Sequence, residues 1–576
     1  MSPNPLPQSP AFIVTDASLW GDESEGRSAV AVGIDGRISA VGPAEEVVAT
    51  AGSATDVISL AGASLWPAFH DSHVHPLAGG LELTWCNLND VHDLAKYEGI
   101  VRAYADGLPA GRWLRGGGWF SDVFPGKQPH RRLLDQWAPN HPAILTSHDN
   151  HCAWVNSAAL RLAGINAATE DPFGARIGRD PDGTPDGLLF EGAIDLVSHL
   201  LPDPAPAELD AAYLLAQQHL HSFGIAGWQD ALVGRALHLP DPTGTYRRLQ
   251  ASGALTSRVT GALWWDREKG LKQIEEFKAL RDGAWGDDAE GDTAWDDKVR
   301  FDTVKIMQDG ICESCTGAML EPYAGVDGRP GEPSGPSMID PVELKEIVTA
   351  LDAAGFSAHF HGVGDRAVRE CLDAVEAARH GNGPSGLRHQ IAHVDVVDPA
   401  DVPRFAALGV TANLQPLWAR ADKEIIERKL PLLGLKRAAM HFPFGALQGA
   451  GAALAMGSDW PVSSMNPLWG IYTAVTRTAP PSDPHGVLPS SYSDPMNPEQ
   501  RLTLSQALEA YTSGSARANG YGDRTGTIAV GMEADLIALD RRVTEVGDLP
   551  GARVARTWVA GRTVHAASAA KAAAGS

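Results

Sequence analysis

Short apolar runs with a period of two mark both ends of the chain. Residues 11–60 contain AFIVTDASLW, SAVAVGIDG and RISAVG between Gly/Asp turns, and 525–565 contain TGTIAVG, ADLIALD and RTWVAGRTV. This alternation is typical of β-strands. Because either set alone is short for an independent core, we expect residues 1–66 and 521–576 to form one composite β-domain, ending in a low-complexity tail.

The middle of the chain has a different pattern. From 67 to 520, β-rich apolar runs alternate with helical stretches such as DPVELKEIVTALDAAG and RAVRECLDAVEAARH, which predicts an α/β fold. A (β/α)₈ TIM-type barrel of roughly 250 or more residues fits this length. The run from 85 to 220 is too long for one connection and contains helical signal of its own, so we interpret it largely as an insertion near the barrel mouth.

Composition narrows the class of protein. Hydrophobic residues make up 44% and charged residues 20%, and the formal charge is −24 from 47 basic and 71 acidic residues. We therefore expect a soluble protein that binds neither nucleic acid nor membrane. The start, MSPNPLPQSPAFIV, lacks a basic region followed by an apolar one, which indicates a cytoplasmic location. Five cysteines suggest reduced thiols, and the pair Cys312 and Cys315 lacks the second pair of a structural zinc site.

The stretch FHDSHVHP at 69–76 contains three histidines at the end of an apolar run. Side chains on a strand alternate between faces, so His73 and His75 share one face and His70 takes the other. Two imidazoles at i and i+2 can share one metal ion. An isolated HxH pair is about as often a polar strand end, so the rest of the chain must decide.

Four later segments carry metal-ligand residues at the ends of apolar runs. They are FDTVKIMQDG with Lys305, FSAHFHGVGDRA with His359 and His361, RHQIAHVD with His389 and His393, and ALAMGSDWP with Asp459. The carboxyl ends of barrel strands converge on one mouth, so we expect these residues to meet in space. Spacing alone does not choose between the two histidines of each pair.

This series of motifs resembles the amidohydrolase superfamily, and within it amidohydrolase family 3, the YtcJ-like metal-dependent hydrolases, which include N-substituted formamide deformylases. The resemblance spans nearly the whole chain, through the blocks HDSHVHP, SHDNHCAWVNSAAL, VKIMQDGICESCTGAMLEPY, HFHGVGDRAV, RHQIAHVD, GSDWPV and GTIAVGMEADLIALD. One departure is Ala392, which stands at a position that is usually acidic in the family.

The resemblance implies one or two divalent ions per chain, Zn²⁺ or another metal, at the barrel mouth. The implied metal ligands are His73, His75, Lys305, His361, His393 and Asp459. The family blocks favour His361 over His359 and His393 over His389, and His70 would pack behind the site. Asp459 would also be catalytic, because in this superfamily such an aspartate moves the proton of the attacking water.

Lys305 lies in the apolar run TVKIM, where a buried ammonium is unfavourable. Its pKa should fall, and the neutral amine can then take up carbon dioxide as a carbamate. That converts a cation into an anionic oxygen ligand that can bridge two metal ions. The alternative is an ordinary ion-paired lysine, with Asp309 or Asp302 as its partner.

Aromatic residues suggest the kind of substrate. Trp119, Trp418 and Trp460 are three of sixteen tryptophans and fall in segments expected near the mouth. They predict contact with an apolar or aromatic small-molecule substrate. His151 lies in SHDNHCAW, a block that resembles the substrate-facing block of the family, although a structural role is an equal alternative.

The predicted activity is hydrolysis of a C–N bond in a formamide, N-acyl amine, carbamate or urea, by a water activated at the metal. One alternative is deamination of a heterocycle, and another is a non-catalytic scaffold relative. The chain has no GxxxxGK[ST] motif, which argues against P-loop phosphoryl transfer. We expect a homodimer.

Overall fold

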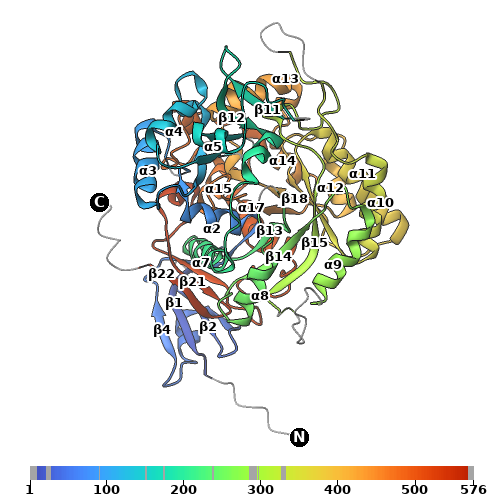
Figure 1. The fold of residues 1–576 in the computed structure, drawn as a ribbon. Helices are drawn as coiled ribbons and strands as arrows, with labels where there is room; N and C mark the ends of the chain where they lie inside the picture. The colour runs from blue at the N-terminus through green and yellow to red at the C-terminus, as the bar shows by residue number, and fades with distance from the viewer. Residues whose placement is uncertain are drawn as a thin grey trace.

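A computed structural model describes residues 9–20, 27–89, 91–148, 152–172, 175–236, 239–283, 295, 297–325 and 333–567. Within these residues, eight parallel strands form a barrel (Figure 1). In spatial order they are β6 (Phe69–Val74), β13 (Ile225–Val233), β14 (Arg258–Trp264), β15 (Val299–Met307), β16 (Ser357–Gly362), β17 (Gln390–His393), β18 (Thr411–Leu414) and β19 (Leu454–Met456).

The two edge strands of this sheet meet beside the mouth. The segment after β19 bonds to the end of β6: the Asp459 N–H donates to the His73 carbonyl at 2.7 Å, and the His75 N–H donates to the Trp460 carbonyl at 2.9 Å. These bonds bring the ends of the first and last barrel strands together. The predicted TIM-type barrel is therefore confirmed.

Helices cover the outside of the barrel. They include α2 (Pro76–Thr84), α7 (Pro206–Ser222), α8 (Thr243–Ala251), α9 (Gln273–Arg281), α10 (Pro341–Ala353), α11 (Asp365–Asn382), α12 (Val402–Leu408), α13 (Leu430–Ala438), α14 (Phe444–Gly449), α15 (Pro467–Thr476) and α17 (Leu504–Glu509). Helix α10 starts where the pattern predicts it, because Pro341 occupies the first turn and the Asp340 side chain accepts from the Val342 and Glu343 N–H groups. Its apolar face packs against α11 and β16.

Both ends of the chain contribute to a second sheet. It contains β1 (Phe12–Leu19), β2 (Ser28–Val32), β3 (Ile38–Pro43), β4 (Asp56–Ser59) and β5 (Ser64–Pro67), with β20 (Leu536–Leu539), β21 (Val554–Val559) and β22 (Arg562–Ala566). The two halves join where β5 and β20 pair antiparallel, with Leu65 opposite Ala538. The composite sheet lies below the barrel in Figure 1.

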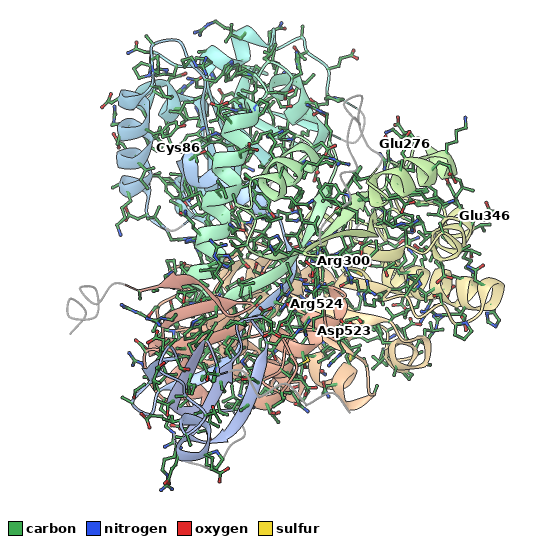
Figure 2. The ribbon with its side chains drawn as sticks, turned by 90° about the horizontal axis from the view of Figure 1, so that it is seen from below. Cys86, Glu276, Arg300, Glu346, Asp523 and Arg524 are labelled. Carbon is green, nitrogen blue, oxygen red and sulfur yellow. The ribbon has the colours of Figure 1, made fainter. Side chains whose placement is uncertain are left out.

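The insertion between β6 and β13 has a sheet of its own. This sheet contains β7 (Cys86–Asn87), β8 (Leu114–Trp119), β9 (Ala143–Ser147), β10 (Cys152–Val155), β11 (Arg176–Arg179) and β12 (Pro185–Phe190), flanked by α3 (Leu94–Gly107), α4 (Arg131–Trp137) and α5 (Ser157–Leu162). Seen from below, Cys86 marks the insertion, whereas Glu276 and Glu346 point outward from helices across the barrel (Figure 2).

The helical signal near the end of the predicted insertion belongs to the barrel layer. Helix α7 packs against α2, α8 and strand β13, beside the composite sheet. Among the described residues, no helix combines the length and apolar character needed to span a membrane.

Candidate metal centre

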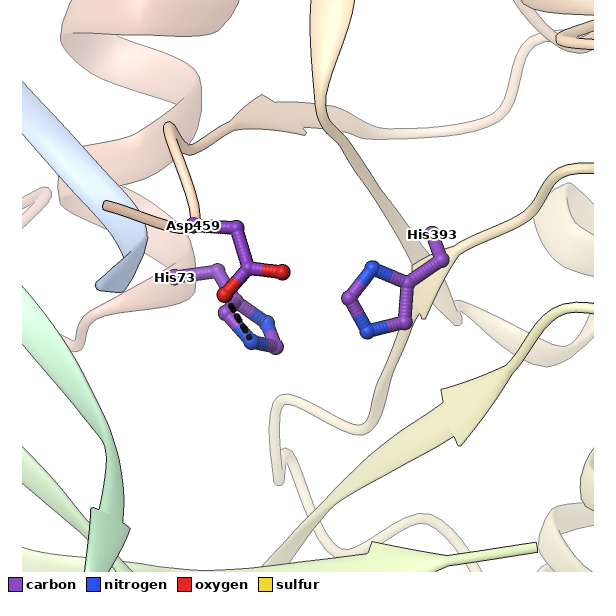
Figure 3. A group of neighbouring side chains, drawn as sticks. All are labelled: His73, His393 and Asp459. Atoms are coloured by element: carbon purple, nitrogen blue, oxygen red, sulfur yellow. Dashed lines mark ion pairs between the residues drawn. The ribbon is translucent and has the colours of Figure 1, made fainter. Parts of the chain in front are cut away.

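Three buried side chains converge inside the barrel mouth (Figure 3). His73 is the second-last residue of β6, His393 is the last residue of β17, and Asp459 follows β19. One ligand atom from each lies within 4.8 Å of the others. His73 Nε2 is 3.5 Å from Asp459 Oδ1, so the carboxylate lies against the first ring of the HxH motif.

The backbone is strained at two of these positions. His393 has φ +77° and Asp459 has φ +56°, a region that costs a residue with a side chain about 1–3 kcal/mol. The buried Asp71 carboxylate helps to hold the backbone around Asp459 in place. It accepts hydrogen bonds from the Ser458 N–H and hydroxyl and from the His73 N–H. Such strain persists where the surrounding bonds over-determine the conformation, as they do here.

The imidazoles at this centre favour their neutral form. Burial lowers the pKa of His73 and His393 well below the usual value, and the nearby Lys305 ammonium lowers both further. Neutral imidazole is the form that binds metals. Asp459 Oδ1 is buried and has no hydrogen-bond partner among the described residues. Neutral nitrogens around one carboxylate oxygen are a donor set that suits zinc and related divalent ions.

His75 lies at the edge of the same group. It precedes α2, and its Nε2 is 3.1 Å from Asp459 Oδ1, with 19% of its side chain exposed. It also lines a cavity of about 10 Å³ together with Asp230 and Leu232. A cavity of this size has room for about one water molecule. Among His73, His75, His393 and Asp459, His75 is therefore the most exposed.

His361 is next to this centre but points elsewhere. Its ring centroid is 4.4 Å from that of His393, while its Nε2 is 3.2 Å from the Gly310 carbonyl oxygen and 3.8 Å from Asp309 Oδ1. The structure thus places His361 beside the three converging residues and outside the group whose ligand atoms meet.

Lys305 is 3% exposed and lies in register with His359 on the neighbouring strand. Burial lowers its pKa to about 8, against the opposing effect of the Asp459 carboxylate. Neither carboxylate considered as an ion-pair partner contacts it: Asp302 binds Arg388, and Asp309 accepts backbone N–H groups, including that of Ala318. Within the described part of the chain, the Lys305 amine forms no ion pair.

The aromatic residues predicted to contact substrate lie in three different places. Trp418 stacks on His393, with ring centroids 5.5 Å apart and an interplanar angle of 10°. Trp119 lies in the core of the insertion, where its Nε1 donates to the Leu145 carbonyl. Trp460 packs against Gly79, where an added Cβ would lie 2.2 Å from the ring. His151 lies outside the described residues.

The family resemblance set His359 aside in favour of His361, and sequence reasoning gave no site role to Gln415. His359 Nε2 is 2.8 Å from His73 Nδ1, and Gln415 Oε1 is 3.0 Å from His393 Nδ1. Polar residues two apart on a predicted barrel strand, as in TANLQ, are the signal that could have found them.

Comparison with known proteins agrees with this geometry. The model of the Amidohydrolase family matches residues 56–565. The protein LONG AFTER FAR-RED 3 of Arabidopsis thaliana is 29% identical over 567 residues, covering 96% of this chain and 91% of that protein. The N-substituted formamide deformylase of Arthrobacter pascens is 26% identical over 574 residues, covering 96% and 97%.

A crystal structure of an uncharacterized metal-dependent hydrolase from Pyrococcus furiosus has the same fold. Its TM-score is 0.67 at 24% identity, covering 92% of this chain and 99% of that chain. The family match extends over all eight barrel strands and over strands β4, β5, β20 and β21 of the composite sheet. On that match, this chain belongs to the amidohydrolase family.

Proposed function

We propose that this protein is a metal-dependent hydrolase that cleaves the C–N bond of a small amide-type molecule with an apolar or aromatic substituent. The observation that carries the proposal is the convergence of His73, His393 and Asp459 in a buried, strained and incompletely hydrogen-bonded group at the barrel mouth. His75 would complete the ligand set from the open side.

Different residues of the chain would have different roles in this reaction. A divalent ion held here supplies a Lewis acid for the substrate carbonyl and for the attacking water. Asp459 accepts the proton that this water loses and gives it to the leaving amine, as a general base and then a general acid. The carboxylate lies close to both proposed histidine ligands, with its Oδ1 3.1 Å from His75 Nε2 and 3.5 Å from His73 Nε2. Trp418 offers an apolar face beside His393.

We also propose that Lys305 carries a carbamate and bridges two ions. Its neutral amine would bond to the carbon of carbon dioxide and release a proton, giving an anionic oxygen ligand. Burial, the lowered pKa and the absence of an ion pair among the described residues support this. We expect the protein to exceed the mass of the unmodified chain by one carbon dioxide, and Lys305→Ala to lose this excess. A small added carboxylic acid should restore some activity to Lys305→Ala. Unmodified Lys305 in the active protein would contradict it.

The substrate class is tested with a panel of formamides, N-acyl amines, carbamates and ureas bearing aromatic substituents, together with amino-substituted heterocycles. Support for a formamide comes from the similarity to the N-substituted formamide deformylase of Arthrobacter pascens and from the apolar face of Trp418. We expect release of a primary amine by the zinc-loaded protein and none by Asp459→Asn. Release of ammonia from a heterocycle would identify a deaminase. Zinc binding without turnover of any panel member would favour a scaffold.

A further inference from the structure

A chain of buried polar side chains runs through the barrel interior between two of the proposed metal ligands. It consists of His359 on β16, Gln229 on β13, Gln390 on β17, and Asn413 and Gln415 on and just after β18. Each is at most 1% exposed. We propose that these five are positioning residues that fix the rings of His73 and His393 for metal binding, an inference that rests on the proposed metal centre.

The direction of the hydrogen bonds is fixed at the His393 end. Gln415 Oε1 lies 3.0 Å from both the backbone nitrogen and Nδ1 of His393. A backbone N–H only donates, so the oxygen of the amide must face His393. The ring nitrogen Nδ1 must then carry the proton, which leaves the lone pair on Nε2. The same oxygen holds His393 in its left-handed conformation, with φ +77°.

A second backbone atom fixes the middle of the chain. Gln415 Nε2 donates to Asn413 Oδ1 at 3.1 Å, and Asn413 Nδ2 donates at 2.8 Å to both the Ser72 carbonyl and Gln390 Oε1. A carbonyl oxygen only accepts, so the Asn413 amide cannot be reversed. Because Ser72 precedes His73, this bond also ties β18 to the backbone of the HxH motif.

The chain ends on the ring of His73. Gln390 Nε2 donates to Gln229 Oε1 at 2.8 Å, and the Gln229 amide nitrogen contacts His359 Nδ1. Because the Gln229 amide nitrogen donates, His359 Nδ1 accepts, and His359 Nε2 donates to His73 Nδ1 at 2.8 Å. Neutral His73 then carries its proton on Nε2 and releases it when this nitrogen binds a metal ion. This contact directs His73 Nε2 toward Asp459.

Packing alone does not explain these residues. The interior of such barrels is usually filled by branched apolar side chains, and a buried amide is unfavourable unless its hydrogen bonds are satisfied. Here each amide is satisfied by its neighbour, and the series begins and ends on histidines of the candidate centre. A satisfied buried network of this kind restricts its members to one arrangement. Partners that bond to the second nitrogen of a ligating histidine set its tautomer and orientation.

The test measures Zn²⁺ affinity by competition with a chromogenic chelator, and the visible absorption of the Co²⁺ form, which reports ligand geometry. Gln415→Leu should bind zinc about 10- to 100-fold more weakly with an altered cobalt spectrum. Gln415→Glu keeps an acceptor for His393 but loses the N–H that donates to Asn413, so it should bind zinc more tightly than Gln415→Leu and more weakly than wild type. Among the described residues Asn413 has no hydrogen bond to a histidine, yet Asn413→Leu should weaken zinc binding about tenfold, because it breaks the hydrogen-bonded chain.

The matched control is Gln217→Leu on α7. Gln217 is 5% exposed and bonds the Ala254 carbonyl and the Thr256 N–H, away from the histidines of the centre. It should lower the melting temperature and leave zinc affinity unchanged. A folded Gln415→Leu with wild-type zinc affinity and cobalt spectrum would overturn the inference while leaving the metal centre intact, and so would an equal loss in Gln217→Leu. If Gln415→Leu does not fold, Asn413→Leu decides. Wild-type protein that takes up no zinc would overturn both proposals.

Discussion

The two ends of the barrel bury charged groups in opposite ways. At the start of β14, the Arg258 guanidinium is 3.0 Å from Asp535 Oδ1 and also contacts Glu533, which Arg524 approaches within 2.6 Å (Arg524 is labelled in Figure 2). At the mouth, the Asp459 carboxylate faces two imidazoles instead of a guanidinium.

This difference distinguishes a cluster that stabilises the fold from a cluster that can bind a metal ion. The lower cluster contains cations and anions of its own, so it neutralises itself and joins the composite sheet to the barrel. At the mouth, burial lowers the pKa of His73, His393 and Lys305, so the basic groups there lose charge readily. The Asp459 carboxylate is therefore surrounded by basic groups that are readily uncharged, and a bound divalent cation would stabilise this group.

The largest expected effect is at the mouth. Asp459→Asn and His75→Ala should reduce turnover at least about 100-fold, and up to about 10⁴-fold, because loss of general acid–base help alone has that range. Circular dichroism should stay near wild type, since the mouth residues lie at strand ends. Activity above about a hundredth of wild type in a folded variant would count against the assigned roles.

The opposite end should respond in stability rather than activity. Arg258→Met leaves Asp535 buried without its cation, while Glu533 keeps Arg524, and loss of a buried partner typically lowers the free energy of unfolding by about 3–5 kcal/mol. Denaturant unfolding measures this, and zinc affinity of the folded variant serves as the control. Unchanged stability, or a loss of zinc affinity, in this variant would contradict the separate roles assigned to the two clusters.

The sequence predicted the barrel and the strand-end positions of the candidate centre because each depends on local patterns. The HxH pair needs only strand alternation, and Asp459 needs only the end of an apolar run. Alternation could not rank His359 against His361, since both are on the same face. The register supplies what the sequence lacked: His359 pairs with Lys305 and His361 with Met307, so His359 lies deeper.

Other features depend on contacts between distant segments. The chain from Gln415 to His359 crosses several strands, and its amides are individually ordinary polar residues in the sequence. Their bond to the Ser72 carbonyl follows only from the closed barrel. Helix α7 was recognised as a helix, but its place against α2 and β13 required the fold.

The smallest expected effect is a pH dependence at the mouth. Burial raises the pKa of Asp230 from 3.8 to about 6, against the opposing hydrogen bond from the Tyr246 hydroxyl. Between those pH values the native state binds more protons than the unfolded state, so this group makes stability fall as pH rises. The full effect is about 3 kcal/mol above pH 6.

Asp230→Asn should remove that slope. Relative to wild type, the unfolding free energy of the variant should rise between about pH 4 and pH 6 and be level above. Chemical denaturation at a series of pH values measures the difference. A constant difference across the window would show that the Asp230 carboxyl titrates near its usual pKa.

The central claim, that the mouth holds a catalytic metal, is tested most directly by elemental analysis of protein never exposed to chelator, paired with its activity before and after metal removal. We expect at least about one zinc or similar divalent ion per chain. Activity should disappear with the ion and return when zinc is added back. A metal-free preparation with full activity would contradict the account.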